Sequence, residues 1–369
     1  MLNRDFLIAP EVVHTEFAVL DSHTLLHSMY ILNYHDMHTS MSPWLEETYQ
    51  ALSVEERHQH KLIHGYLMEG VNILAMEYQH SFEQLLDALD QVDPIKLRDQ
   101  VFSWMQERED FPGVEALLND VELLVSFTAK VLEEKQKEKT DIEENEQDWR
   151  EIYPLLNQPD QLKTLISTHL RTLWERYYRL EWEKTRPMLE ASVEAFNKLD
   201  STNKSALDVI QMVTGRDLRE AFSKFLEGKT KLTFIPSPHI GVFVGLHHIS
   251  QDDNAIGIFY GARLPKESKA DSLATNALNR SALLVQLNAL ADDTRLQILK
   301  LLQERGELCA QDIMNELDLS QSSASRHLRQ LAASNYIVER RRDVAKCYQL
   351  SVDHIEETIS AIRIYMGLD

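Results

Sequence analysis

One stretch near the C-terminus, Ser320 to Leu331, constrains the fold more than any other part of this sequence. Ala324, Leu328 and Leu331 recur at the spacing of one buried helix face. Ser320 is a suitable N-cap, because its hydroxyl can accept a hydrogen bond from a free backbone N–H. The opposite face is polar or basic and has no carboxylate: Gln321, Ser322, Ser325, Arg326 and Arg329. It can offer donors to base edges and positive charge to phosphates, so the sequence predicts a helix for the DNA major groove.

The residues before this stretch predict the rest of a helix-turn-helix. Leucines at helical spacing mark two helices; Asp292 or Asp293 would cap the second and Gly306 would stop it. Residues 310–317 predict a short third helix, and residues 318–320 form a tight turn into the stretch described above. Two short helices joined in this way are typical of a helix-turn-helix, whose second helix enters the groove.

The residues after the stretch predict a wing. Residues 336–339 and 346–350 have the composition of two strands, and the turn between them begins with three arginines. Arginine is suited to guanine and glutamine to adenine, so Arg326 and Gln321 are the expected base readers. The wing would add affinity and salt dependence. The complete set of candidate DNA-binding residues is Gln321, Ser322, Ser323, Ser325, Arg326, His327, Arg329, Arg340, Arg341, Arg342 and Lys346.

The charge distribution agrees with a localised DNA contact. The net charge of the chain is −21, which is unusual for a nucleic-acid binder. Residues 320–350, however, contain six basic and two acidic side chains, a local charge of +4, and this leaves −25 for the rest of the chain. An acidic body with one basic patch restricts where a polyanion can bind.

The last helix predicts a dimer. Five apolar residues follow one another at intervals of 3, 4, 3 and 4, the spacing of a heptad seam: Val352, Ile355, Ile359, Ile362 and Met366. We expect this seam to pair with the same helix of a second chain, and a two-fold dimer would read a palindromic operator. The alternative is that the helix closes the core of its own domain.

The first 230 residues predict a large helical region. Ser53 with Glu56, and Ser81 with Gln84, have the spacing of capping boxes, and a charged helical stretch runs from Glu122 to Asp148. Near Lys229 the pattern changes to short β-rich segments, which predict a small antiparallel hairpin or sheet. The expected fold is therefore mainly α, with residues 1–263 as an α-rich sensing or coupling domain, 264–275 as a linker and 276–369 as the winged helix-turn-helix.

Composition limits the class of protein further. No apolar run approaches the roughly 20 residues of a membrane span, and the first residues lack the order of a secretory signal. Cys309 and Cys347 are the only cysteines. We therefore expect no disulfide framework, no membrane partner and a cytoplasmic location. Motifs for phosphate loops, dinucleotides and hydrolytic nucleophiles are lacking, so the expected protein is not an enzyme and needs no cofactor.

Three ordered segments resemble the ArsR family of bacterial winged-helix repressors. Residues 289–299 resemble its second-helix signature, residues 319–328 its recognition-helix motif and residues 338–348 its wing. The resemblance covers about residues 276–369 and implies a homodimer that releases operator DNA when a signal arrives. The hairpin region, residues 237–241 and 259–263, resembles a long N-terminal extension found on some such regulators, for which the resemblance implies no activity.

Family members that sense soft metals carry two cysteines separated by one residue in the third helix. Here Cys309 is present, but Gln311 stands at the second position, and one thiolate is insufficient for such a metal. Members that bind zinc on the last helix use paired histidine and carboxylate ligands. This chain has Asp353, His354 and Glu357 but no second histidine further along, so we expect no metal in the C-terminal module.

Other signals remain open as alternatives. Three histidine pairs lie at helical spacing, His23/His27, His35/His38 and His60/His64, and with Asp36 or Glu69 they could form a zinc site. Hydrogen-bonded or surface histidines are the default interpretation. Cys309 and Cys347 could meet across the wing as a redox switch, although two inert thiols are the simpler expectation. The N-terminal region could also bind a small-molecule or protein effector and dominate the function.

Overall fold

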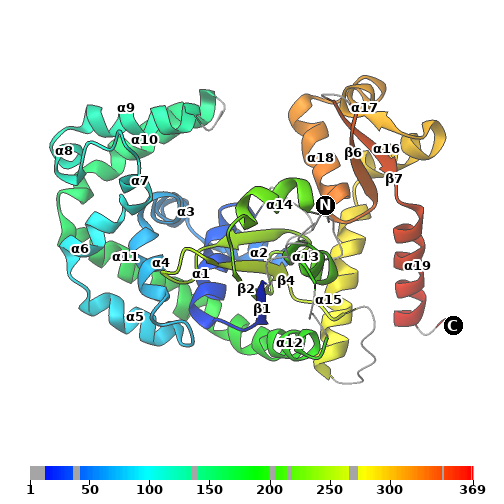
Figure 1. Ribbon diagram of the computed structural model, residues 1–369, viewed down its shortest axis with the longest axis horizontal. Helices are drawn as coiled ribbons and strands as arrows, with labels where there is room; N and C mark the ends of the chain where they lie inside the picture. The colour runs from blue at the N-terminus through cyan, green and yellow to red at the C-terminus, as the bar shows by residue number, and fades with distance from the viewer. Residues whose placement is uncertain are drawn as a thin grey trace, which may run out of the picture. The chain divides into compact units, whose positions relative to one another are not determined.

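The computed structural model describes residues 13–35, 42–134, 139–199, 204–214, 218–265, 273–342, 345–366 and 368. The prediction of a mainly α chain with small sheets is confirmed (Figure 1). The chain divides into two compact units. The described residues of Met1–Val19, Tyr34–Thr48 and Glu183–Asp369 form the sheet-and-wing unit, and Leu20–Asn33 with Tyr49–Trp182 form the helical unit. Among the described helices, none combines the length and the apolar character that a membrane span requires.

The helical unit is built from short helices that pack around a common core. In chain order its elements are α1 (Asp21–Leu32), α3 (Val54–Leu62), η1 (Ile63–Leu67), α4 (Glu69–Ala75), α5 (Phe82–Gln91), α6 (Pro94–Gln100), α7 (Ser103–Gln106), α8 (Val114–Asn119), α9 (Val121–Glu134), α10 (Lys139–Leu156), α11 (Pro159–Leu173), η2 (Trp174–Tyr178) and the start of α12 (Arg179–Asn197). The elements η1 and η2 are π-helical turns that continue the helices before them.

Local capping signals place the helix starts of this unit. At α3 the predicted capping box is confirmed: Glu56 N donates to Ser53 Oγ at 3.1 Å, and Ser53 N donates to a Glu56 carboxylate oxygen at 2.8 Å. At α5, Gln84 N donates to Ser81 Oγ at 3.3 Å. The charged stretch 122–148 contains two helices, α9 and α10, which pack against each other; residues 135–138 lie outside the described residues.

The elements of the sheet-and-wing unit come from both ends of the chain. They are β1 (His14–Phe17), α2 (Pro43–Ala51, whose last turn belongs to the helical unit), the remainder of α12, α13 (Ala206–Thr214), α14 (Arg219–Leu226), β2 (Lys231–Ser237), β3 (Val244–His247) and β4 (Ala255–Gly261), then α15 (Leu273–Leu290), α16 (Asp293–Arg305), β5 (Leu308–Cys309), α17 (Ala310–Leu317), α18 (Gln321–Ala333), β6 (Ile337–Arg342), β7 (Ala345–Leu350) and α19 (Val352–Met366). The predicted linker lies largely in 266–272, outside the described residues.

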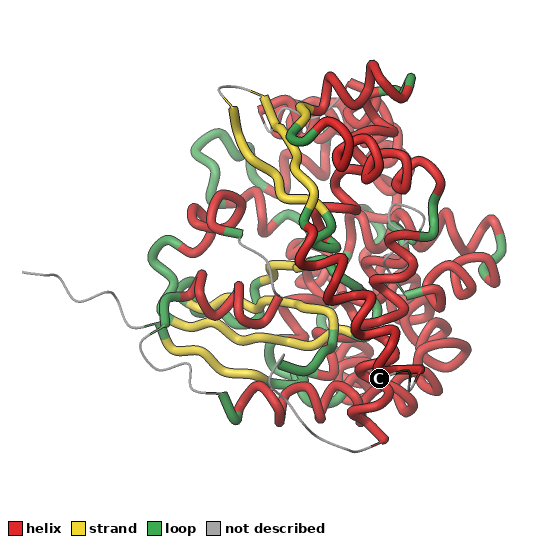
Figure 2. The backbone as a smooth tube through the Cα atoms, turned by 90° about the vertical axis from the view of Figure 1, so that its right-hand side faces the viewer, coloured by secondary structure: helices red, strands yellow, loops and turns green. Residues whose placement is uncertain are grey.

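The first sheet is mixed and has the strand order β1-β2-β4-β3. The predicted hairpin is present as the antiparallel pair β3–β4. An antiparallel arrangement throughout is wrong, because β2 runs parallel to both β1 and β4. The strand β1 was not predicted; it comes from the start of the chain and is only four residues long. Figure 2 shows these strands as one group and the wing strands as another.

Pro236 lies in an interior strand without disrupting the sheet. Phe234 O accepts a hydrogen bond from Ala18 N, so Phe234 and, two residues later, Pro236 direct their backbone groups to the β1 side. The pairing with β1 ends at Phe234, and therefore no strand of the described part of the chain requires an N–H from the proline on that side.

An aromatic cluster joins this sheet to α12. The rings of Phe17 and Phe234 lie 5.0 Å apart, and those of Phe17 and Phe196 lie 5.2 Å apart. Tyr260 packs edge-on against this stack, and its hydroxyl lies 3.1 Å from Ser192 Oγ. The buried side chains of α13 and β2 complete the same core, so N-terminal strand, middle helices and sheet form one folded body.

We predict that Gly261→Ala destabilises the sheet-and-wing unit strongly. A Cβ atom at position 261 would lie 1.8 Å from Gly241 O, so the backbone would have to move, and we expect a loss of roughly 3 kcal/mol. Gly65→Ala is the matched control, because nothing lies within 4 Å of its added Cβ. Chemical denaturation of both variants measures the effect; equal stabilities would contradict the close approach.

Candidate DNA-binding site

The predicted helix-turn-helix is present as α16, α17 and α18. Gly306 ends α16 with a φ of 81°, and Asp318 adopts a φ of 51° in the turn between α17 and α18. Ser320 then caps α18 as predicted, since Ser323 N donates to its Oγ at 3.3 Å. These local signals set the direction in which α18 leaves the turn.

The predicted apolar stripe of α18 is buried. Ala324, Leu328 and Leu331 are 1%, 1% and 0% exposed. The leucines pack in a core with side chains from the neighbouring helices and the wing, including Ala289, Ile298, Leu302, Ile313, Tyr336, Ile337 and Tyr348. The orientation of α18 is therefore fixed along its length, and its other face must point away from this core.

The exposed face of α18 carries most of the predicted contact residues. Gln321, Ser322, Ser325, Arg326 and Arg329 are all exposed. Among the described residues, neither Arg326 nor Arg329 makes an ion pair, so both guanidinium groups are available to a polyanion. Ser323 is half-buried and uses its N–H at the cap, and His327 is 6% exposed. Ser323 and His327 therefore do not belong to the exposed face of α18.

His327 belongs to a largely buried polar group where α18 meets α16. Its Nδ1 lies 3.5 Å from an Asp292 carboxylate oxygen, which also accepts a hydrogen bond from Arg295 N at 2.9 Å. Arg295 is 3% exposed and donates from Nη2 to Asn288 O at 2.9 Å. Burial lowers the pKa of both His327 and Arg295. From the sequence Asp292 was expected only as a cap, and its approach to His327 of α18 was not predicted.

The wing is the antiparallel pair β6–β7, as predicted. Arg340 and Arg342 are exposed, as is Lys346, which pairs with Glu339 at 2.7 Å. Arg340 Nη1 lies 3.9 Å from a Glu307 carboxylate oxygen. Arg341 lies in β6 opposite Lys346, and residues 343–344 at the turn lie outside the described residues. Four basic residues therefore follow one strand pair adjacent to the helix-turn-helix.

The two cysteines correct an expectation from the sequence. Cys309 lies directly opposite Cys347 in the β5–β7 pair, and their sulfur atoms form a disulfide bond. The prediction that they lie close together is confirmed, whereas the expectations of two inert thiols and of a chain without a disulfide are wrong. The reason is the strand register, which places the two Cα atoms directly opposite each other, 3.7 Å apart. The bond joins the start of α17 to the wing.

The last helix, α19, divides its apolar residues between two faces. Ile355 packs against the winged core, and the buried Thr358 hydroxyl lies 3.1 Å from the Tyr336 hydroxyl. Val352, Ile359 and Met366, seven residues apart, are 58%, 46% and 64% exposed. Ile362 is half-buried. Of the predicted seam, Ile355 thus packs inside the domain, whereas Val352, Ile359 and Met366 form an exposed apolar row.

Comparison with known proteins places these features in one family. Residues 292–338 match the family described as "Bacterial regulatory protein, arsR family". The chain is 47% identical over 62 residues to the arsenical resistance operon repressor of Escherichia coli K12, covering 17% of this chain and 53% of that protein. It is 35% identical over 71 residues to a cadmium resistance transcriptional regulatory protein CadC homolog of Staphylococcus aureus, covering 19% and 59%.

A third relative is matched over most of its length. The chain is 35% identical over 74 residues to an HTH-type transcriptional regulator of Methanocaldococcus jannaschii, covering 20% of this chain and 83% of that protein. The chain spans about half the length of the arsenical resistance operon repressor of Escherichia coli K12 and of the arsenic resistance transcriptional regulator ArsR1 of Pseudomonas putida. No solved structure matches the chain.

We predict that Asp292→Ala destabilises the winged domain far more than the neighbouring change Asp293→Ala. The first change removes a helix cap and the carboxylate whose charge favours the protonated form of the buried Arg295, so we expect a loss of roughly 2–4 kcal/mol. Asp293 is exposed and accepts one bond from Gln297, so its removal should cost less than about 1 kcal/mol. Thermal unfolding followed by circular dichroism compares the stabilities of the two variants. Similar losses of stability would contradict the role given to Asp292.

Proposed function

Because this chain belongs to the ArsR family through its C-terminal domain, we propose that it is a transcriptional repressor that binds operator DNA as a homodimer. The observation that carries the proposal is the exposed face of α18. It combines hydrogen-bonding side chains with two arginines that make no ion pair among the described residues, and its opposite face is buried. A helix held in this way presents its polar face as a rigid unit to a major groove.

The proposed roles of the contact residues follow from their side chains. Arg326 and Gln321 read guanine and adenine edges, and Ser322 and Ser325 contact bases or phosphates. The exposed wing residues Arg340, Arg342 and Lys346 contact phosphates or the adjacent minor groove. The acidic remainder of the chain, with a net charge of −25, disfavours DNA elsewhere on the protein.

The proposed dimer uses the exposed row of α19. Val352, Ile359 and Met366 recur every seven residues, which is the repeat of a helix that packs along a second helix. Leu284 of α15, the helix that packs against α19, is also exposed, at 45%. Two copies related by a two-fold axis would place two α18 helices on the half-sites of a palindromic operator. The helical unit would then bind the effector that releases the DNA.

A first experiment recovers genomic DNA bound to the tagged protein and measures binding of the recovered site at several salt concentrations. We expect Arg326→Ala to cost about 1–3 kcal/mol at one base position and to relax the preference there. Replacing Arg340 and Arg342 together by alanine should weaken binding to all sequences alike and lower the salt slope by about 1 per residue.

The control for these changes is Arg305→Ala, which removes an exposed arginine at the end of α16 that pairs with Glu316 of α17. It should leave both specificity and salt slope close to wild type. An unchanged base preference in the Arg326 variant would exclude it as a base reader. Salt-sensitive binding without any preferred site would contradict the operator function.

For the dimer, we predict that Ile359→Asp raises the dimer dissociation constant at least tenfold, because it would bury a carboxylate in an apolar contact. Ser360→Asp, an exposed neighbour on α19, introduces the same charge outside the row and should have little effect. Sedimentation equilibrium measures both variants. A wild-type monomer, or equal dissociation constants for the two variants, would exclude this interface.

A further inference from the structure

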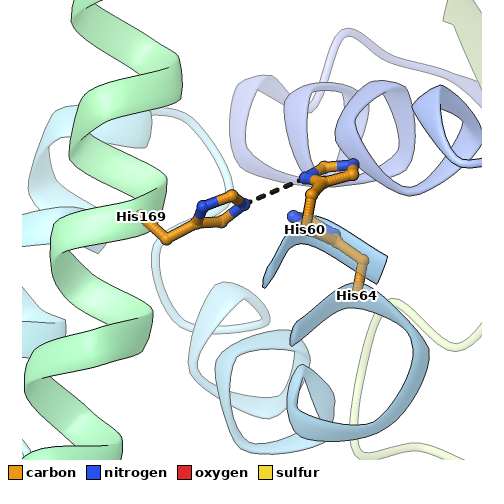
Figure 3. A group of neighbouring side chains, drawn as sticks. All are labelled: His60, His64 and His169. Carbon is orange, nitrogen blue, oxygen red and sulfur yellow. Dashed lines mark hydrogen bonds between the residues drawn. The ribbon is translucent and has the colours of Figure 1, made fainter. Parts of the chain in front are cut away.

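Three buried histidines, His60, His64 and His169, lie close together in the helical unit. In the sequence they are more than 100 residues before the predicted DNA-binding residues. His60 comes from α3, His64 from the π-helical turn η1 and His169 from α11. One ring nitrogen from each lies within 4.8 Å of the other two. Figure 3 shows the rings turned toward one another, with His60 and His64 one helical turn apart on the same side. Figure 3 also shows His169 facing them from α11.

The hydrogen bonds define which nitrogen of His60 faces the group. His60 Nε2 lies 3.0 Å from Met29 O, and a carbonyl oxygen can only accept, so Nε2 carries the proton. Its Nδ1 is therefore a lone pair, and it lies 2.9 Å from His169 Nε2. A ring nitrogen bound to a backbone carbonyl on one side and free to coordinate on the other is the usual arrangement of a metal-ligating histidine.

A buried ring nitrogen of His64 indicates that the group lacks a bonding partner. Its Nε2 is buried and has no hydrogen-bond partner among the residues that the structure describes. A buried polar atom in this state costs about 1–3 kcal/mol, and a hydrogen-bonded histidine network would be expected to satisfy it. The turn that carries His64 is π-helical, a conformation that occurs frequently at functional sites. These observations are independent of the distances among the three rings.

We propose that His60, His64 and His169 bind a divalent transition metal ion such as zinc. This inference goes beyond the proposed regulatory function and does not rest on it. The ligands are His60 Nδ1, His64 Nε2 and His169 Nε2, and water or another exchangeable group takes the fourth position. The His169 proton moves from Nε2 to Nδ1 as the metal replaces its hydrogen bond to His60, so no net proton is released.

The dimensions and the chemistry of the donors fit such an ion. Zinc–nitrogen bonds of about 2.0–2.1 Å in a tetrahedral site separate the ligand nitrogens by about 3.3 Å. Modest side-chain rotation would produce this spacing from a group whose nitrogens lie within 4.8 Å. Imidazole favours zinc, copper, nickel and cobalt over magnesium or calcium, which prefer oxygen. Burial lowers the pKa of His60 to about 3 and of His169 to about 4, so both are neutral ligands at physiological pH.

This site joins one predicted histidine pair to a residue that no sequence spacing indicates. The pair His60/His64 was one of three considered, and His169 lies 109 positions after His60. For the pair His35/His38, His38 lies outside the described residues, as does Asp36. The group has neither thiol nor carboxylate, so it differs from the cysteine sites that the family resemblance implies.

The test uses the full-length, tag-free protein, stripped with a chelator and titrated with Co²⁺ and then Zn²⁺. We expect one Co²⁺ per chain, with visible d–d absorption that Zn²⁺ removes, and a rise in the thermal unfolding midpoint with either metal. His64→Leu and His169→Leu should each weaken binding at least tenfold. His58→Leu is the matched control, because it changes an exposed histidine of the same helix.

His64→Leu also separates ligand loss from unfolding. It removes an unpaired buried nitrogen, so the metal-free variant should be at least as stable as wild-type protein without metal. The His169 variant provides a second measurement if His64→Leu fails to fold. Absence of Co²⁺ absorption in the wild-type protein would overturn the proposal. So would retention of binding in both variants, or a sulfur-to-cobalt charge-transfer band, which would place the metal at the reduced thiolates of Cys309 and Cys347.

Discussion

The burial of one face of α18 is the constraint on which the C-terminal domain depends. Leu328 and Leu331 are almost fully buried. Truncating either side chain would lower the stability of the domain by several kcal/mol, because buried apolar surface and packing contacts would be lost. Rotating α18 to hide Arg326 would expose these leucines and would place a guanidinium in an apolar core. The position of the basic face is therefore a consequence of core packing, and the buried His327, which lies 3.5 Å from Asp292, belongs to the same inward face.

The sequence predicted local features well and distant contacts poorly. The cap at Ser320, the stop at Gly306 and the stripe of α18 each depend on residues within a few positions, and all are present. The parallel pairing of β1 with β2 joins residues more than 200 positions apart, and β1 is too short to carry a clear period. Most of the exposed face of the candidate site follows from helical periodicity alone, except that His327 turns inward.

His327 shows why a residue type and a helical position are not enough. It stands beside Arg326 in a basic, polar run, and sequence analysis counted it with the contact residues. In the fold, the imidazole ring is buried, and its Nδ1 lies 3.5 Å from a carboxylate oxygen of Asp292 where α16 and α18 meet. Only the path of the preceding helices brings that carboxylate near. The disulfide has the same origin, since the register of β5 on β7 is a property of the folded domain.

Burial has a second consequence in the helical unit. Burial disfavours the charged, protonated form of these imidazoles, and for this reason the pKa values of His60 and His169 lie far below 6.5. The same burial keeps each ring in the neutral form whose lone pair can coordinate. A divalent ion also brings charge into the interior, but it forms a bond to each of three nitrogens at once, whereas a proton can satisfy at most two. The environment that excludes protons from this cluster therefore favours a metal ion over them.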